Sequence, residues 1–268
     1  DRGPSGGGDR FAAPSAMIRA DTADQVDAAF EAMQRAQSDG KWLAGYVSYE
    51  FGYLTSPKLE RLLPTDRVLP LIHFGVFDAP QPATPTAVDA LVDLDPLQPQ
   101  WTSDRYAQAF STVHDYIGAG DIYQVNLTFP IATRSDASPD ALYAKLRERQ
   151  AVPHGALVNF GETALLSRSP ELFFSLTSKG ALTTRPMKGT APRGATPAQD
   201  DTVRDALQSS EKNRAENLMI VDLLRNDMSR VSEIGSVKVP ELFVVERFAT
   251  LHQMTSCITS QILPDTTL

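Results

Sequence analysis

The sequence predicts an α+β fold with largely antiparallel sheets, and three observations lead to this prediction. Strand-like segments follow one another without an intervening helix after residue 154 and again after residue 235. Isolated segments with a 3.6-residue apolar period stand between these runs. The chain also lacks the regular alternation of strand and helix that a parallel sheet requires.

The composition is that of an ordinary globular protein. The chain has 268 residues, of which 42% are hydrophobic and 22% charged, a length that allows one large core or two smaller ones. Its formal net charge of -8 argues against a general nucleic-acid binder. Cys257 is the only cysteine, which is typical of the reducing cytosol. No apolar run is long enough to span a membrane, so we expect a cytoplasmic protein without a membrane partner.

The first hundred residues are expected to form a shortened N-terminal region with strands and one helix. Residues 22–40 predict the helix, because Val26 and Phe30 follow helical spacing and Gly40 is suited to end it. Residues 43–53 are rich in β-branched and aromatic residues and predict a strand. The Pro-rich residues 78–100 predict a connector. We therefore expect one domain over residues 1–100 and a catalytic domain over residues 101–268.

The remaining elements are assigned from the same patterns. Residues 103–118 predict an amphipathic helix with Ser103 as N-cap. Its buried stripe is expected to contain Tyr106, Phe110, Val113 and Ile117. Strands are expected over 122–133, 155–160, 163–168 and 171–186, with a turn at Ser-Lys-Gly, and after residue 235. Helices are expected over 140–149 and 211–226, and the second has the strongest pattern.

Residues 183–194 read TTRPMKGTAPRG and predict a constrained loop. Their prolines and glycines restrict the backbone and exclude a regular helix. Lys188 lies here, between Arg185 and Arg193, and the order Lys-Gly-Thr is not that of a phosphate-binding P-loop. Three interpretations stay open: a solvated surface lysine, an anion-binding loop, or an amine that performs covalent chemistry.

Three further residues have both a structural and a functional interpretation. Glu171 is either a solvated carboxylate at a sheet edge or a general acid, and the turn after its strand leads the chain back towards Lys188. Glu216 is either the partner of Lys212 in a surface ion pair or an oxygen ligand for Mg2+. His252, taken alone, is more typical of a hydrogen-bonded sheet residue than of a catalyst.

The chain resembles the chorismate-utilising enzymes over roughly residues 40–268. The resemblance rests on the order and spacing of five segments: GDIYQVNLT, SRSPELFF, TRPMKGTAPRG, KNRAENLMIVDLLRND and TLHQMTSCI. Within the family the chain is most similar to component I of aminodeoxychorismate synthase. Members that add water to chorismate have a lysine base in place of Gln124, and anthranilate synthases have a small residue in place of Lys188.

The resemblance implies a fold of two largely antiparallel sheets packed as a sandwich, with helices outside. It also implies that chorismate reacts with ammonia from a separate glutaminase subunit to give 4-amino-4-deoxychorismate, on the route to 4-aminobenzoate and folate. Lys188 would attack C2 of the ring, Glu171 would protonate the departing C4 hydroxyl, and His252 would lie near that group.

The same resemblance implies the residues that bind the substrate and the metal. Gln124, Gly189 and Thr190 would contact the substrate, and Glu216 would be one ligand of Mg2+. Anthranilate synthases have a second glutamate where this chain has Asn213. The family pattern continues past residue 268, so we expect a truncated chain that lacks its C-terminal part, binds chorismate poorly and turns it over little.

Two alternatives to aminodeoxychorismate synthesis stay open. An anthranilate synthase component I is the nearest enzymatic alternative. A non-catalytic chorismate-fold segment that docks a glutaminase is the other. Regulation by tryptophan is not supported, because we find no Leu-Leu-Glu-Ser type of segment in the N-terminal region.

Overall fold

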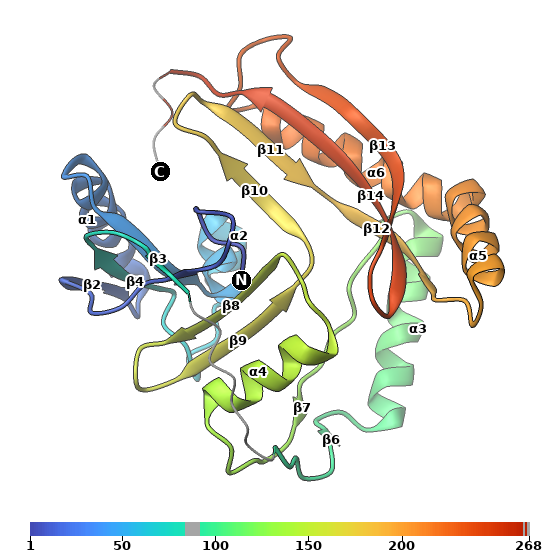
Figure 1. The fold of residues 1–268 in the computed structure, drawn as a ribbon, viewed down its shortest axis with the longest axis horizontal. Coiled ribbons are helices and arrows are strands. Elements are labelled where there is room, and N and C mark those ends of the chain that lie inside the picture. Colours follow the sequence, from blue (N-terminus) through green and yellow to red (C-terminus); the bar gives the residue numbers. More distant parts are fainter. Residues whose placement is uncertain (84–91, 265, 267–268) are drawn as a thin grey trace. The chain divides into compact units, whose positions relative to one another are not determined.

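The computed structural model describes residues 1–83, 92–264 and 266. The chain divides into two compact units, one made of residues 1–86 and 146–268 and the other of residues 87–145. Figure 1 labels the helices and strands. The predicted domain boundary near residue 100 stays a prediction. Among the described residues, no helix combines the length and the apolar composition that crossing a bilayer requires.

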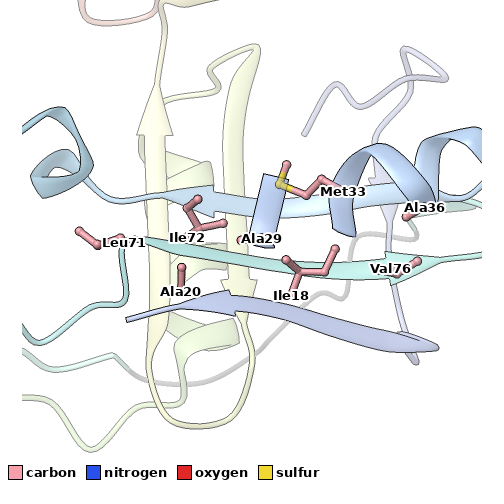
Figure 2. Close-up of a cluster of buried hydrophobic side chains, with 8 residues drawn as sticks. All are labelled: Ile18, Ala20, Ala29, Met33, Ala36, Leu71, Ile72 and Val76. Carbon is pink, nitrogen blue, oxygen red and sulfur yellow. The ribbon is translucent and has the colours of Figure 1, made fainter. Parts of the chain in front are cut away.

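A small antiparallel sheet and one helix form the core of the N-terminal region. The sheet has the order β2 (Ala16–Ala20), β4 (Ile72–Phe77), β3 (Trp42–Val47). Helix α1 (Val26–Ser38) follows a short 3-10 turn, η1 (Ala23–Gln25), and packs on this sheet. Figure 2 shows the side chains that meet between them: Ile18, Ala20, Ala29, Met33, Ala36, Leu71, Ile72 and Val76. The predicted helix is confirmed.

The strand predicted over residues 43–53 is wrong in its second half. Ser48 donates its backbone N–H to the carbonyl of Leu71, and beyond this bond β4 offers no further partner. The chain then turns into a 3-10 helix, η2 (Tyr49–Thr55), and a short α2 (Pro57–Glu60). This turn places the ring of Phe51 against the ring of Phe30, with the ring centroids 5.9 Å apart. Burial of the aromatic ring therefore replaces strand pairing here.

The main sheet is organised around β14 (Leu251–Gln261). One edge of β14 pairs first with β12 (Met187–Pro192) and then with β11 (Ala181–Arg185), and β13 (Lys238–Arg247) pairs along its other edge. Strand β10 (Leu172–Leu176) extends the sheet beyond β11. The strands predicted in these regions are confirmed.

Two helices pack on one face of this sheet. They are α5 (Pro197–Ser209) and α6 (Glu211–Ser229), and both contact β12, β13 and β14 (Figure 1). Ile258 of β14 packs against Val221 of α6 in a buried apolar cluster. Because side chains alternate along a strand, the even-numbered residues of β14 face the helices and the odd-numbered ones face away. The predicted helix at 211–226 is confirmed and extends to Ser229.

The loop predicted over residues 183–194 is wrong for most of its length. Residues 183–185 end β11, as the expected strand 171–186 requires, and residues 187–192 form β12, so Lys188 lies on a strand. Proline and glycine favour loops in an isolated segment, but here β14 supplies a hydrogen-bonding partner on both sides of Pro186. Tertiary pairing has overridden local preference.

Two further pairs of strands complete this unit. β8 (His154–Asn159) and β9 (Ala164–Ser169) correspond to the strands predicted over 155–160 and 163–168, and they pair antiparallel. β1 (Asp9–Arg10) pairs with β5 (Gln81–Pro82).

The unit of residues 87–145 corrects two predictions. Of the strand expected over 122–133, only β7 (Ile131–Ala132) is present, paired with β6 (Gln98–Pro99). Helix α3 (Ser103–Ala119) has Thr102, not Ser103, as its N-cap, because the Thr102 hydroxyl accepts the N–H of Arg105. Helix α4 (Pro139–Arg149) matches its prediction and runs across the boundary between the units.

The predicted burial of the α3 stripe is also wrong. Residues 103–119 contain no buried side chain, and Phe110 is 54% exposed. In the described part of this unit the β6–β7 pair is too short to offer a sheet face. The aromatic contacts are instead local, with Trp101 stacked on Phe129 at 5.5 Å and Tyr106 edge-on to Phe129 at 6.0 Å.

Replacing Ile258 by alanine is expected to lower the free energy of unfolding by about 2–5 kcal/mol, because the change leaves a cavity between β14 and α6. Urea unfolding followed by circular dichroism measures this. Ile234→Ala is the matched control, since Ile234 is fully exposed, and it should change the value by at most about 0.5 kcal/mol. Equal losses in the two variants would contradict the packing described here.

Candidate active site

Lys188 lies in a β-bulge of β12. Met187 pairs with Thr255 and Thr190 pairs with Gln253, so Lys188 and Gly189 together face the single residue Met254. Gly189 has φ of 98°, which favours glycine. A β-carbon at position 189 would also lie 3.1 Å from the β-carbon of Asn213 on α6. Such bulges redirect a side chain out of the regular alternation of the strand.

Glu171 lies beside this bulge. Its Oε1 accepts the backbone N–H of Met187 at 2.9 Å, and its side chain is exposed. This hydrogen bond fixes the Glu171 carboxylate to the backbone of Met187, the residue that precedes Lys188. The hairpin of β10 and β11 brings the two residues together in the manner that the sequence predicted, although their catalytic roles stay predictions.

The two arginines that flank Lys188 are both engaged by carboxylates. Arg185 donates to Glu241 and Glu246, each at 2.8 Å. Burial lowers the pKa of Arg185, but the hydrogen bonds to Glu246 and Glu241 outweigh burial and raise this pKa overall. Arg193 donates to both oxygens of Asp200, at 2.8 and 2.9 Å.

Lys188 differs from these arginines. It is partly buried, and it makes no hydrogen bond or ion pair through its side chain with any residue in the described ranges. An anion-binding loop would use the arginines, but their guanidinium groups already have anionic partners. The amine of Lys188 is therefore the cation of this segment that remains available for another molecule.

Asp200 joins α5 to the strands. Besides the two bonds from Arg193, it accepts the N–H of Gly194 at 2.9 Å, and its Oδ1 lies 2.8 Å from Nε2 of His252. The pKa of this carboxyl lies well below its usual range, chiefly because of the hydrogen bonds from Arg193. A buried carboxylate with this many donors is a strong structural tie.

His252 faces the helices. It is fully buried, and its partner is Asp200 of α5. This geometry agrees with the structural interpretation of His252 as a hydrogen-bonded sheet residue. Its placement near a leaving group stays a prediction.

Gln253 is a candidate that sequence reasoning missed. It faces away from α5 and α6, where its Nε2 donates to the carbonyl of Gly189 at 3.0 Å and its Oε1 accepts the hydroxyl of Thr190 at 2.8 Å. The signal that could have found it is the two-residue period of a strand: if 251–261 is a strand, His252 and Gln253 cannot face the same side. Gln253 thus holds both residues that follow Lys188.

Glu216 lies on α6 near the bulge. Lys212 is 4.0 Å away, so the predicted surface pair is present at the limit of an ion pair, and the Glu216 side chain is 42% exposed. At 100° per residue, Glu216 lies about 60° from Asn213 and about 100° from Asn217 around the helix, and both asparagines face β12. Glu216 is therefore at the edge of the helix face that packs on Lys188.

Glu216 as a ligand of Mg2+ stays a prediction. Among the described residues, no three histidine, cysteine, aspartate or glutamate side chains gather closely enough to hold an ion. Mg2+ is commonly held by only one or two protein carboxylates together with water and substrate oxygens. One half-exposed carboxylate is compatible with that arrangement.

Two residues lie apart from this cluster. Gln124 belongs to the unit of residues 87–145, where it is exposed in a segment outside the helices and strands, and its role stays a prediction. Cys257 is buried on β14, and burial raises the pKa of its thiol. A high thiol pKa disfavours the reactive thiolate.

A family profile described as chorismate binding enzyme matches residues 3–268. The chain belongs to this family. Its relatives include the aminodeoxychorismate synthase of Streptomyces griseus, 41% identical over 63% of this chain and 24% of that protein. Aminodeoxychorismate synthase component 1 of Escherichia coli K12 is 42% identical over 62% of this chain and 36% of that protein. The matches thus span between a quarter and somewhat more than a third of these relatives.

Solved structures support the fold of this chorismate binding enzyme. The crystal structure of anthranilate synthase component I from Streptococcus pneumoniae TIGR4 matches 97% of this chain and 70% of that chain, with a TM-score of 0.80 and 22% identity. A putative isochorismate synthase, DhbC, from Bacillus anthracis matches with a TM-score of 0.70 and 17% identity. The predicted α+β fold of the anthranilate synthase type is confirmed.

Replacing Asp200 by asparagine in this chorismate binding enzyme should lower the melting temperature at neutral pH. Because the folded-state pKa of Asp200 lies below its unfolded value, its stabilising effect is complete above that unfolded value, about 4. The effect is lost as the pH falls towards the folded-state pKa. The difference in melting temperature between the wild type and Asp200→Asn should therefore narrow below about pH 4.

Asp201→Asn is the matched control for this experiment. Asp201 is 54% exposed and pairs with Arg204 and Arg247 at the surface, so its loss should change the melting temperature little. Calorimetry over a pH series measures both variants. A constant difference for Asp200→Asn down to about pH 2 would contradict the stabilising role of this charge.

Proposed function

We propose that this chain is the Lys188-bearing part of an aminodeoxychorismate synthase component I. In this proposal chorismate reacts with ammonia to give 4-amino-4-deoxychorismate, and the ammonia comes from a glutaminase subunit. The observation that carries the proposal is the amine of Lys188, which lies in a bulge beside the Glu171 carboxylate and has no anionic partner among the described residues. The identity of about 42% to aminodeoxychorismate synthases adds support.

The chemistry follows from one amine and one carboxylic acid. The nitrogen of Lys188 forms a bond to C2 of the ring while both conjugated ring double bonds shift by one position and the C4–O bond breaks. Glu171 gives its proton to the departing hydroxyl, which leaves as water. Ammonia then bonds to C4, both double bonds shift back, the C2–N bond to Lys188 breaks, and the new ammonium group returns a proton to Glu171. The amine must be neutral to attack. The covalent intermediate replaces one difficult displacement by two easier steps.

The neighbouring groups would bind and orient the substrate. Gly189 and Thr190 follow the nucleophile directly, and Gln253 fixes both of them. Gln124 and His252 are further proposed contacts, to the substrate and to the departing group. Glu216 would hold Mg2+, which neutralises carboxylate charge on the bound substrate.

Incubation of the longest form of the enzyme with chorismate should place an adduct on Lys188 that peptide mass spectrometry detects. The adduct corresponds to chorismate minus one water, since the C4 hydroxyl has left. Lys188→Ala should lose the adduct completely, and Lys179→Ala, a change in the exposed turn between β10 and β11, should keep it. This measurement requires a single covalent step and no turnover.

Product analysis separates the two enzymatic candidates. With an ammonium salt, the longest available form of the enzyme should give 4-amino-4-deoxychorismate, and Lys188→Ala should abolish this product or shift it towards anthranilate. The same product at the same rate from Lys188→Ala would refute the covalent role. Anthranilate as the main product of the wild type would favour an anthranilate synthase instead.

A further inference from the structure

Asn217 is a fully buried residue on α6 with a side-chain amide, and the reaction scheme gives it no role. Burying an amide costs free energy unless its hydrogen-bonding groups are satisfied. Its Nδ2 donates to the carbonyl of Lys188 at 3.3 Å and to the carbonyl of Met254 at 3.5 Å, and its Oδ1 accepts the hydroxyl of Ser256 at 2.6 Å. Each polar atom of the side chain thus has a partner on the sheet.

The chemistry of these partners fixes which way the amide faces. The carbonyl oxygens of Lys188 and Met254 can only accept hydrogen bonds, so the NH2 group must face them. Ser256 receives the N–H of Phe243 at 3.1 Å on its hydroxyl oxygen, and it directs its own hydrogen to Asn217. The amide therefore has a single satisfactory orientation.

The two carbonyls that Asn217 binds belong to the two strands that meet at the bulge, one on β12 and one on β14. Lys188 belongs to the pair of residues on β12 that faces one residue of β14, and Met254 is that one residue. A bulge interrupts the regular ladder and leaves its extra residue unpaired. The side-chain amide of Asn217 replaces the missing bond and connects the two strands at this point.

A second bulge lies in β13, on the other edge of β14, and it contacts the same hydrogen bonds through Ser256. Glu241 pairs with Cys257 and Val244 with Thr255, so two residues of β13 face Ser256. One of them, Phe243, has φ of 57°, an unusual value for a bulky residue. Its N–H is bound by Ser256, and the guanidinium of Arg214 on α6 lies 4.7 Å from the centre of its ring. Ser256 and Asn217 therefore join both bulges to α6.

We propose that Asn217 is the positioning residue that holds the Lys188 bulge in the geometry needed for attack on the substrate, a role that rests on the proposed function. Asn217 does not touch the reacting atoms in this scheme; it acts through the backbone of Lys188. Glu216, the residue before it, is the proposed metal ligand. One rigid helix thus sets the nucleophile and the metal ligand relative to each other.

The first experiment tests the positioning without chorismate. Lysines of the folded 268-residue chain are labelled with a small amine reagent, and the rate at Lys188 is compared with the rate at Lys58, an exposed lysine on α2. The partly buried Lys188 should react more slowly than Lys58 in the wild type. Asn217→Leu keeps the same branched arrangement of four heavy side-chain atoms but has no donors, so the bulge loosens and the rate at Lys188 should rise towards that at Lys58.

Ser232→Ala is the matched control for this labelling. Ser232 is buried and hydrogen-bonded to Ser260 at 2.8 Å, as part of a different contact of the sheet. Its loss should leave the ratio of the two labelling rates unchanged. An unchanged ratio in folded Asn217→Leu would overturn the proposal. If circular dichroism shows that Asn217→Leu does not fold, Ser256→Ala decides instead, since it removes the partner that orients Asn217 and should raise the ratio in the same direction.

The second experiment measures adduct formation on Lys188 at several chorismate concentrations. Asn217→Leu should lower the maximal rate by about 10–100-fold, the loss typical of a displacement near 1 Å, with the half-saturating concentration unchanged. A change in half-saturation alone would assign Asn217 to substrate binding and overturn the positioning role. If the wild type forms no adduct, the proposed function fails, while the labelling ratio still decides whether Asn217 positions Lys188.

Discussion

The structure depends on β14 being hydrogen-bonded along both of its edges. Two strands that are consecutive in the chain, β11 and β12, share one edge, and β13 takes the other. Most residues from 252 to 260 are also buried. Because this strand cannot shift without breaking both ladders, it can hold an irregular partner on each side. The bulges at Lys188 and Phe243 exist because their common neighbour is fixed.

Regular elements could be predicted from sequence where local pattern and tertiary pairing agree. Helix α6 was predicted to within three residues of its end, and strands were expected after residue 235, where β13 and β14 lie. Residues 183–194 failed for the opposite reason: their prolines and glycines favour a loop, and only pairing with β14 makes them strands. The stripe of α3 failed because a periodic apolar pattern says which face is apolar, not whether anything covers it.

The candidate site likewise has features that could be predicted from the sequence and features that could not. The proximity of Glu171 to the Lys188 segment could be predicted, since a tight turn forces two strands side by side. The orientation of His252 could not be predicted from its segment alone, because one residue of register decides which of two neighbours faces the helices. Asn217 and Ser256 were inconspicuous in the sequence, since neither amide nor hydroxyl has a spacing that marks it. Their importance follows from burial, which makes every hydrogen bond they form obligatory.

The adjacency of Glu216 and Asn217 constrains how this segment can change in length. Between Ser210, which caps α6, and these residues, every added or deleted residue would turn the following side chains by about 100° and shift them by about 1.5 Å. One such change would move Asn217 off the bulge and Glu216 to another side of the helix. Insertions and deletions between residues 210 and 217 would therefore break the contact between α6 and the Lys188 bulge.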